Sequence, residues 1–449
     1  MRIKNLHLEN FRGFEKLDIE FPENSNVAVL IGENGAGKSS ILNAVSKFIN
    51  AYFRQIFRDA GIDTSVEESA YFKITDYNNY NNLLPKINLQ FIENSENLDL
   101  SIYREGQKGS FLNKDKGQKI NFKLLASYNN SGEKIEISLE SFYIEQTNFY
   151  FNIGERNLFN SIYADCKSIN LTDSNKTIKY FEEWFLSLEN LELQTKVEKE
   201  NFNFRLTELE IFRHFIKTFY NNLNDIKFDD LKGKREKGDN FFQSASNWIE
   251  LKKANKSLRL NQLSSGEINL LMLVSDIVRR QILLFDLNQM PIFETKEEPT
   301  IENIQQSEGI VLIDEIELHL HPKWQRNILP ALITTFPNIQ FIVTTHSPQV
   351  ASSVPNNSIF VIEDGKVLNN NFFNEGRDSN AILQEIFGVE KRPKEFGDKL
   401  AHFYTLLENQ KVAEAEKILQ ELSEKWGTLD AEIVRATLYF QDTLDEVVA

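Results

Sequence analysis

Residues 27–42 read VAVLIGENGAGKSSIL, and this stretch decides how the rest of the chain is interpreted. Val27–Ile31 is an apolar run with the length of a buried strand, and residues 40–42 read as the start of a helix. Between them lies the spacing Gly-x-x-x-x-Gly-Lys-Ser, from Gly32 to Ser39. Glycines let such a loop turn so tightly that its N–H groups converge on a phosphate chain. The order of strand, glycine-rich loop and helix therefore predicts a nucleotide phosphate site.

The polar residues of this loop have roles that fit their spacing. The Lys38 ammonium is expected to reach the β- and γ-phosphates, and the Ser39 hydroxyl to ligate Mg²⁺. Gly32, Gly35 and Gly37 supply the backbone freedom that a phosphate cradle needs. A glycine-rich turn without a ligand is the weaker interpretation, because strand and helix signals flank the loop on the correct sides.

The composition limits the class of protein. A chain of 449 residues is too long for one compact core, so two or three structural units are expected. The single cysteine, Cys166, excludes a disulfide framework and a CxxC metal site. No apolar run reaches about 18 residues, and MRIKNLHLEN is not typical of a signal peptide, so we expect a cytoplasmic protein without a membrane segment. The net charge of −16 argues against a surface covered with phosphate contacts, so we expect DNA to bind through a partner.

The first 150 residues read as strands around the phosphate loop. The segment IKNLHLENFRGFEKLDIEF alternates in polarity on both sides of residues 10–14, which predicts a hairpin leading into the phosphate-loop strand. Arg12 lies at its bend, where a nucleotide contact and a surface turn charge both remain open interpretations. Further strand-like stretches predict a small antiparallel sheet packed on the nucleotide core. They span residues 86–93, 98–104, 119–125 and 134–150.

The middle of the chain changes character twice. Residues 155–226 carry apolar side chains at helical spacing, which predicts a helical insertion that is too short for a long coiled-coil arm. Residues 227–259 form the one clearly basic region, with KGKREKG and further lysines and an arginine. A solvated loop is the favoured interpretation of this region, and a phosphate-binding patch is the alternative.

Three motifs in the second half complete the pattern. Residues 263–267 read LSSGE and precede a helical run, and a helix N-terminus of this kind favours an anion. Residues 310–315 read IVLIDE, which predicts a buried parallel strand with two carboxylates at its C-terminal edge. We expect Asp314 to hold Mg²⁺ and Glu315 to polarise the attacking water. A second buried strand, IQFIVTT, ends at His346, which we interpret as a γ-phosphate contact rather than a core histidine.

Taken in order, these motifs resemble the ATP-binding cassette (ABC) class of P-loop ATPases. IKNLHLENFRGF and ELHLHP are similar to the RecF/SMC-type heads within that class, and the resemblance covers most of residues 1–365. It implies ATP and Mg²⁺ as ligands and a homo-dimer or higher homo-oligomer, in which LSSGE contacts the ATP held by a second subunit. The implied ATP contacts are Gly32, Asn34, Gly35, Gly37, Lys38, Ser39 and Ser40 in one subunit, and Ser264, Ser265, Gly266 and Glu267 in the other.

The same resemblance assigns the remaining parts of the site. It implies that Asp314 and Ser39 hold Mg²⁺, that Glu315 is the catalytic base and that His346 senses the γ-phosphate. An ABC ATPase also has a glutamine in the Q-loop. Two strand residues are candidates for it, and Gln146 is preferred over Gln90.

The C-terminal residues carry a narrower resemblance. GRDSNAILQEIFGVEKRP, followed by ENQKVAEAEKILQEL, is similar to the tail of the PtuA family, the ATPases of Septu and related retron anti-phage systems. That similarity implies a PtuB-like HNH nuclease as partner, with a retron reverse transcriptase and its RNA–DNA product as further candidates. The sequence after residue 365 contains neither an HNH pattern nor a Toprim-like acidic cluster. This fits an ATPase that controls a separate nuclease.

The predicted architecture is an α/β, ABC-type P-loop ATPase head with a helical insertion and a C-terminal helical subdomain. The head comprises residues 1–154 and 227–375, the insertion 155–226, and the helical partner-binding region 376–449. ATP binding is expected to join two heads, and hydrolysis to release them. One alternative is a RecF-like repair or replication ATPase that binds DNA directly, with a steep salt dependence. The other is a scaffold that binds ATP without turnover, which the paired acids at 314 and 315 argue against.

Overall fold

A computed structural model describes most of the chain. The described residues are 2–59, 86–93, 96–105, 108–114, 124–128, 134–137, 174–223, 228–233, 249–253, 256–288, 298–368, 373–389 and 392–448. The chain divides into two compact units, Met1–Arg377 and Asp378–Ala449. Within the described ranges, no helix is both long and apolar enough to cross a membrane.

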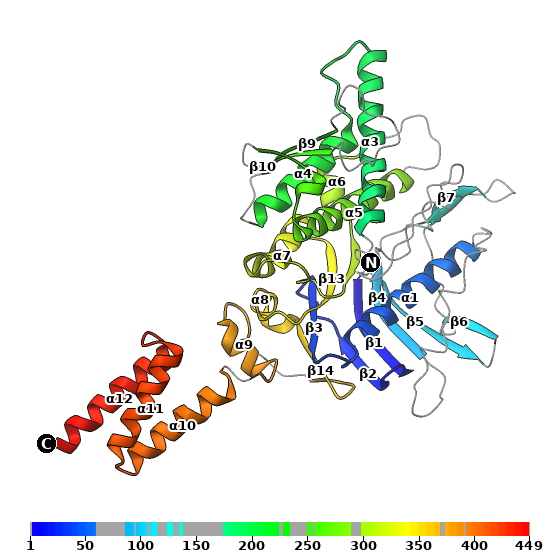
Figure 1. The fold of residues 1–449 in the computed structure, drawn as a ribbon. Helices are drawn as coiled ribbons and strands as arrows, with labels where there is room; N and C mark the ends of the chain where they lie inside the picture. Colours follow the sequence, from blue (N-terminus) through cyan, green and yellow to red (C-terminus); the bar gives the residue numbers. More distant parts are fainter. Residues whose placement is uncertain are drawn as a thin grey trace. The chain divides into compact units, whose positions relative to one another are not determined.

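A mainly parallel sheet forms the centre of the first unit (Figure 1). Its order is β12-β13-β3-β14-β15, and only β15 runs antiparallel to its neighbour. All residues of β12 and β13 are buried, as expected for parallel strands that are covered on both faces. The three predicted core strands are therefore confirmed. The strands span Gly309–Ile313 (β12), Ile339–Thr344 (β13), Val27–Gly32 (β3), Ile359–Glu363 (β14) and Lys366–Leu368 (β15).

Helices pack around this sheet. The helix α1 begins at Lys38, directly after the phosphate loop, and contacts β3, β12 and β13. The helix α4 packs against α5 and α7, and the rings of Phe215 and Phe336 stack at 5.5 Å between centroids. Part of the helical segment after residue 155 thus contributes to the core of the head. The helices span Lys38–Asp59 (α1), Thr207–Asn222 (α4), Ser265–Asn288 (α5), Ile301–Gln305 (α6), Pro322–Thr335 (α7) and Pro348–Ala351 (α8).

A second, antiparallel sheet packs beside α1, in the order β2-β1-β4-β5-β6 (Figure 1). The predicted N-terminal hairpin is confirmed, with its turn at Arg12 and Gly13. The strands predicted at 86–93 and 98–104 are also present in this sheet. The short pair β7 and β8 overlaps the two later stretches, whose remainder lies outside the described residues. The strands span Arg2–Phe11 (β1), Phe14–Glu20 (β2), Lys86–Glu93 (β4), Glu96–Glu105 (β5), Lys108–Lys114 (β6), Leu124–Tyr128 (β7) and Lys134–Ile137 (β8).

The region between the two halves of the head differs in part from the sequence prediction. Helix α3 (Ser174–Glu198) and α4 form a helical hairpin. The basic region contains an antiparallel ribbon of β9 (Phe228–Gly233), β10 (Ile249–Lys253) and β11 (Lys256–Arg259), where a loop was the favoured interpretation. Charged residues outnumber apolar residues in these short strands, so the strand signal in the sequence is weak.

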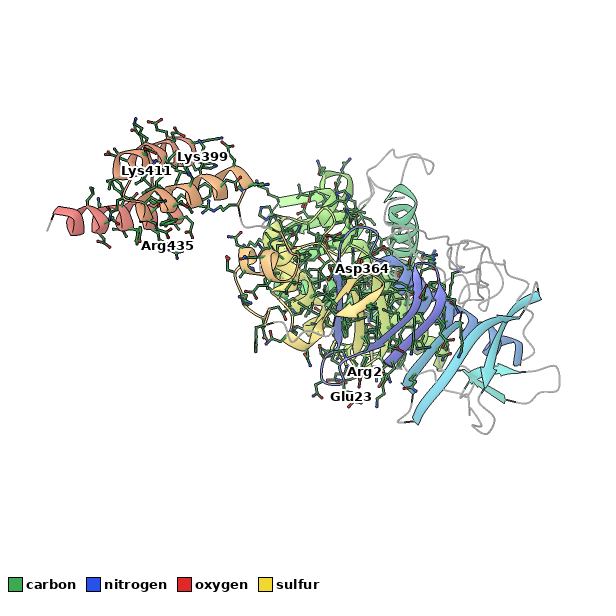
Figure 2. All side chains as sticks on the ribbon, turned by 90° about the horizontal axis from the view of Figure 1, so that it is seen from below. Arg2, Glu23, Asp364, Lys399, Lys411 and Arg435 are labelled. Carbon is green, nitrogen blue, oxygen red and sulfur yellow. The ribbon has the colours of Figure 1, made fainter. Side chains whose placement is uncertain are left out.

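The second unit is helical and has its own core. The predicted helical region is confirmed, and three long helices pack together around Phe403, Leu422 and Ala436. Arg392 forms a bidentate ion pair with Asp430 at the start of α12, at 2.6 and 2.9 Å. Figure 2 shows charged side chains on the outside of these helices. The helices span Ser379–Glu385 (α9), Lys394–Glu408 (α10), Val412–Trp426 (α11) and Ala431–Val448 (α12).

Candidate functional site

The phosphate loop is held in place by close backbone packing. A Cβ atom on Gly32 would lie 2.4 Å from the Ile362 carbonyl oxygen, because β14 pairs with β3 at this residue. A Cβ on Gly37 would lie 2.4 Å from the ring of Phe14, and Gly37 has a φ of +102°. The buried Phe14 begins β2, so the N-terminal hairpin supports the loop directly. Glycine is therefore required at both ends of the loop for steric reasons as well as for phosphate access.

Lys38 lies among the residues at the ends of the parallel strands. Its Nζ donates to the carbonyl oxygens of Gly32 and Glu33, both at 2.9 Å. Burial lowers the pKa of Lys38, while the carboxylates of Asp314, Glu315 and Glu317 act in the opposite direction. The predicted phosphate-binding cation therefore lies within electrostatic reach of the acids that follow β12. The next residue, Ser39, is exposed.

The two predicted acids are fixed by a threonine of the neighbouring strand. The Thr344 hydroxyl donates to Asp314 Oδ1 and accepts a hydrogen bond from the Glu315 N–H at 2.8 Å. Glu315 has a φ of +52°, which turns the chain sharply after β12. The Asp314 carboxylate is thus oriented by a bond across the sheet, and the Glu315 side chain remains exposed. The roles predicted for them, a metal ligand and a base that meets water, stay predictions.

Sequence reasoning missed a third acid. One oxygen of Glu317 accepts from the Thr345 hydroxyl at 2.7 Å, and the other accepts from the His346 N–H at 2.6 Å. Glu317 therefore ties the turn after β12 to the segment that carries the predicted γ-phosphate sensor. The sequence shows a carboxylate two residues after Glu315. It does not show the hydrogen-bond partners of Glu317, which lie about thirty positions away.

The LSSGE loop combines exposed and buried residues. Ser264 and Ser265 are exposed, whereas Gly266 and Glu267 are buried. The Ser264 hydroxyl and N–H both donate to Glu267 Oε2 at 2.9 Å, and the Glu267 N–H donates back to the Ser264 hydroxyl at 3.3 Å. This reciprocal pair is a capping box. The Glu267 carboxylate thus stabilises the start of α5, and its nucleotide contact stays a prediction.

Gly266 has a packing role as well. A Cβ atom at this position would lie 2.5 Å from the carbonyl oxygen of His319, in the turn after β12. The LSSGE loop therefore contacts the ELHLHP segment of the same chain. A larger residue at Gly266 would disturb that contact, so an effect of such a variant would not isolate a nucleotide contact. Ser265 is the better probe of this loop, because it is exposed.

The remaining predicted contacts are spread more widely. The guanidinium of Arg12 donates to Asn43 of α1 at 3.0 Å, so Arg12 lies beside the helix that follows the phosphate loop. Gln90 lies in β4 and accepts a hydrogen bond from Asn5 of β1 at 2.7 Å, which gives it a role within the antiparallel sheet. Gln146, the preferred Q-loop residue, lies outside the described residues. Asn34 and Gly35 are exposed at the tip of the phosphate loop, and Ser40 is half-buried in α1.

These residues fit ATP with Mg²⁺. The glycine loop leaves space that a Cβ atom on Gly35 would enter without contact, and its φ of +87° suits glycine. A hydroxyl oxygen from Ser39 and a carboxylate oxygen from Asp314 are the hard donors that Mg²⁺ prefers, and phosphate oxygens and water normally complete its shell. Lys38 would supply the positive charge for the phosphates.

The bridging hydroxyl of Thr344 gives a first prediction. Thr344→Val keeps the shape of the side chain but removes the bonds to Asp314 and to the Glu315 N–H. We expect ATP hydrolysis to fall by roughly 10–100-fold, as for other residues that orient a metal ligand. Phosphate release measured over a range of Mg²⁺ concentrations is the appropriate assay, and Thr334→Val on the exposed face of α7 is the matched control. Equal activities of both variants would contradict an orienting role for Thr344.

Fold and site together define the class of protein, a P-loop ATPase with an ABC-type head. The model of the AAA ATPase domain family matches residues 1–351, and the chain belongs to this family. The chain is 28% identical to the Retron Ec83 probable ATPase of Escherichia coli, over 99% of this chain and 88% of that protein. It is 24% identical to the Septu protein PtuA of Bacillus thuringiensis, over 87% of this chain and 85% of that protein. The SMC head domain from Thermotoga maritima aligns with a TM-score of 0.41 and 16% identity, covering 82% of this chain and 97% of that one.

Proposed function

We propose that this ATPase binds ATP between two heads and that hydrolysis separates them. The observation that carries the proposal is the separation of roles in LSSGE. Gly266 packs on His319 and the Ser264–Glu267 pair caps the helix, while Ser265 is exposed at the N-terminus of a long helix. Such a position favours an anion. The phosphates on the loop of a second subunit are the anion that the proposed dimer brings there.

The residues at the strand ends then carry out hydrolysis. Lys38 and the loop N–H groups hold the phosphates, and Glu315 accepts a proton from the attacking water. Asp314 and Ser39 would hold Mg²⁺, which supplies positive charge to the phosphate oxygens when bound. Glu317 positions His346 by accepting its backbone N–H, so that the imidazole can contact the γ-phosphate. Loss of that phosphate removes these contacts and releases the second subunit.

A mixing experiment tests whether the site is shared. Lys38→Ala is expected to abolish phosphate binding, and Ser265→Arg to block the contact with the partner's nucleotide. Each variant alone should be inactive. In a mixed dimer, however, one site combines the intact loop of the Ser265→Arg subunit with the intact LSSGE of the Lys38→Ala subunit. Phosphate release should therefore reappear when the two inactive proteins are mixed.

Two controls make this experiment decisive. Ser265→Ala should retain most activity, because it removes a hydroxyl without blocking the surface. Nucleotide affinity should be normal in the Ser265→Arg monomer and lost in Lys38→Ala. A mixture that stays inactive, although both variants fold and mixed dimers form, would contradict the shared site.

We further propose that the ATPase acts in anti-phage defence and controls a separate HNH nuclease. Support comes from the names of the relatives, retron ATPases and PtuA, and from the C-terminal resemblance to the PtuA family. The second unit supplies a suitable docking surface. Its last helix exposes Val434, Leu438 and Tyr439, and residues 408–449 carry ten acidic and four basic side chains. An acidic surface complements a partner that must be basic to bind DNA.

A retron reverse transcriptase and its RNA–DNA product are further candidate partners, to be sought by co-purification. Direct DNA binding by this chain, as in a RecF-like repair ATPase, is the alternative function. The net charge of −16 speaks against it. It would appear as DNA binding by the purified ATPase, with an affinity that falls steeply as salt is raised.

A further inference from the structure

The Gln325 side chain joins two segments of the proposed active site. Gln325 lies in the first turn of α7 and is half-buried. Its Nε2 donates to the Leu320 carbonyl oxygen at 2.9 Å, in the turn that follows β12. Its Oε1 accepts a hydrogen bond at 2.8 Å from the hydroxyl of Ser347, the residue after His346. One amide therefore links the turn that carries the acids to the segment that carries the predicted γ-phosphate sensor.

The neighbours of Gln325 leave one orientation for its amide. Ser347 is buried, and its hydroxyl oxygen accepts the N–H groups of Gln349 and Val350 at 3.1 and 3.3 Å. The single proton of that hydroxyl therefore points at Gln325, which must present its amide oxygen there. The Leu320 carbonyl can only accept, so it takes the NH₂ group. A side chain with a donor or an acceptor alone would lose one of the two links.

Helix α7 holds Gln325 in a fixed position. Asn327 of α7 donates to the Leu223 carbonyl oxygen, at the end of α4, at 3.4 Å. Phe215 of α4 stacks on Phe336 at the end of α7, and both rings are buried. Side chains on packed helices are placed more precisely than side chains on loops. Gln325 can therefore set the position of the groups that it binds.

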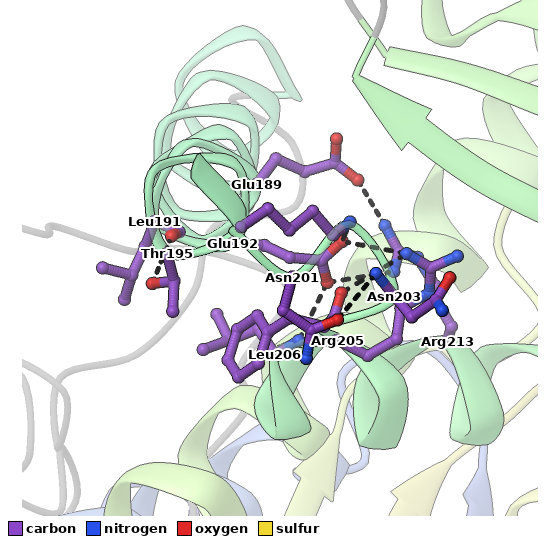
Figure 3. Close-up of polar contacts among 11 residues, drawn as sticks. Glu189, Leu191, Glu192, Thr195, Asn201, Asn203, Arg205, Leu206 and Arg213 are labelled. Carbon is purple, nitrogen blue, oxygen red and sulfur yellow. Dashed lines mark hydrogen bonds and ion pairs between the residues drawn. The ribbon is translucent and has the colours of Figure 1, made fainter. Parts of the chain in front are cut away.

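Helix α4 is in turn tied to α3 by charged side chains (Figure 3). Arg213 of α4 forms an ion pair with Glu189 of α3 and approaches Glu192 to 3.9 Å. Glu192 is buried and accepts the Leu206 N–H at 2.9 Å, which fixes the start of α4 to α3. These bonds lie away from Gln325, so the support beneath α7 should persist when that side chain is changed.

Two contacts hold the His346 segment against the turn after β12. Glu317 accepts the His346 N–H at 2.6 Å, and Gln325 accepts the hydroxyl of Ser347, the next residue. A single contact fixes one distance but leaves the backbone free to rotate about it. The second contact removes that rotation, and the direction of the His346 imidazole depends on it. Orientation of this kind is a large part of what a catalytic group contributes.

We propose that Gln325 is a positioning residue that orients the His346 imidazole toward the γ-phosphate of the same subunit, which rests on the proposed function. The phosphate loop is held instead by β14 and Phe14. Loss of the Gln325 links should therefore slow hydrolysis and leave ATP affinity unchanged. LSSGE keeps its capping box and the packing of Gly266 on His319. The effect should therefore be confined to the site of the subunit that carries the change.

Gln325→Met tests this role, because methionine keeps the length of the side chain but loses both hydrogen bonds. The turnover number should fall by roughly 10–100-fold, as for a small misplacement of a catalytic group, while the dissociation constant for ATP stays at the wild-type value. Gln306→Met is the matched control, since it makes the same change at an exposed glutamine that bonds Asn338 in the same unit. Equal turnover in both variants, or an equal loss of ATP affinity and turnover in Gln325→Met, would overturn the proposal.

A double-mutant cycle tests whether Gln325 acts through His346. His346→Ala should lower turnover, and adding Gln325→Met should change the remaining rate by less than about twofold, because the group that Gln325 positions is already absent. A further fall as large as that of the single variant would give Gln325 a role independent of His346 and overturn the inference. Full activity of His346→Ala would overturn the proposed γ-phosphate contact together with it.

Mixed dimers locate the effect within the assembly. When Lys38→Ala and Ser265→Arg subunits are mixed, the restored site uses the phosphate loop and His346 of the Ser265→Arg subunit. Adding Gln325→Met to that subunit should lower the restored phosphate release by roughly 10–100-fold, and adding it to the Lys38→Ala subunit should not. A fall in the second placement would overturn the inference. A mixture that is inactive without Gln325→Met contradicts the shared site, and the double-mutant cycle then decides the role of Gln325.

Discussion

Glu315→Gln should slow ATP hydrolysis by roughly 10²–10⁴-fold, the range for loss of a general base, while ATP binding is retained. The amide has the shape of the carboxylate but cannot accept the proton from the attacking water. The geometry explains why the variant should lose hydrolysis but keep ATP binding. The position of Glu315 is set by its backbone N–H, which donates to Thr344, and its side chain is exposed. Lys38 and the glycine loop, which are proposed to hold the phosphates, are unchanged.

Single-turnover phosphate release and binding of a fluorescent ATP analogue together measure the two effects. The variant should also accumulate as an ATP-bound dimer, visible by gel filtration. Glu302→Gln is the matched control, because it makes the same chemical change at an exposed residue of α6 in the same unit. Turnover of Glu315→Gln that equals the control would remove Glu315 from the mechanism.

The residues at the strand ends of the site could be predicted because the sequence pattern that identifies them is local. A run of apolar residues followed by glycine, Asp-Glu or histidine identifies a buried strand and the group that it delivers. Parallel strands of one sheet then bring these groups to one edge. The sheet order β12-β13-β3 places the ends carrying Asp314, His346 and the phosphate loop side by side.

The bonds between these strand ends could not be predicted in the same way. Thr344 meets Asp314, and Glu317 meets Thr345, only because β12 and β13 pair in one register, with Ile313 opposite Val343. No local pattern encodes that register. The capping role of Glu267 was available from the Ser-x-x-Glu spacing, but the interpretation of LSSGE as a nucleotide contact took precedence. The packing of Gly266 on His319 joins segments more than fifty residues apart and needed the structure.

The second unit shows the limit of periodicity arguments. The apolar spacing at Phe403, Leu406 and Leu419 predicts packed helices, and these residues are buried in the core. A third long helix, α12, carries apolar residues on both its buried and its exposed sides. Ile433 and Phe440 face the core, whereas Leu438 is 56% exposed. A helix with two apolar faces gives no clear amphipathic signal, and its second face is the reason to expect a partner.

Deletion of residues 378–449 should abolish retention of the proposed HNH nuclease while ATP hydrolysis continues at the wild-type rate. The boundary follows from the contacts that end the head. Asn374 is fully buried and donates to the carbonyl oxygens of Ala351 and Val354 at 2.8 and 2.7 Å. The Gly376 N–H donates to the Ser352 carbonyl at 2.9 Å. A chain that ends at Arg377 therefore keeps every one of these bonds and should remain folded.

A pull-down of the nuclease with the full-length and truncated ATPases, each checked for phosphate release, measures both effects. Leu438→Arg in the full-length protein is the finer test, because Leu438 is exposed on α12 and its replacement leaves the core residues Ile433 and Phe440 in place. It should weaken retention of a basic partner strongly, by charge repulsion and by loss of apolar contact. Lys411→Arg, which preserves charge at an exposed position before α11, should bind normally. If the nuclease still binds the truncated head, the docking surface lies within residues 1–377 and the second unit has another role.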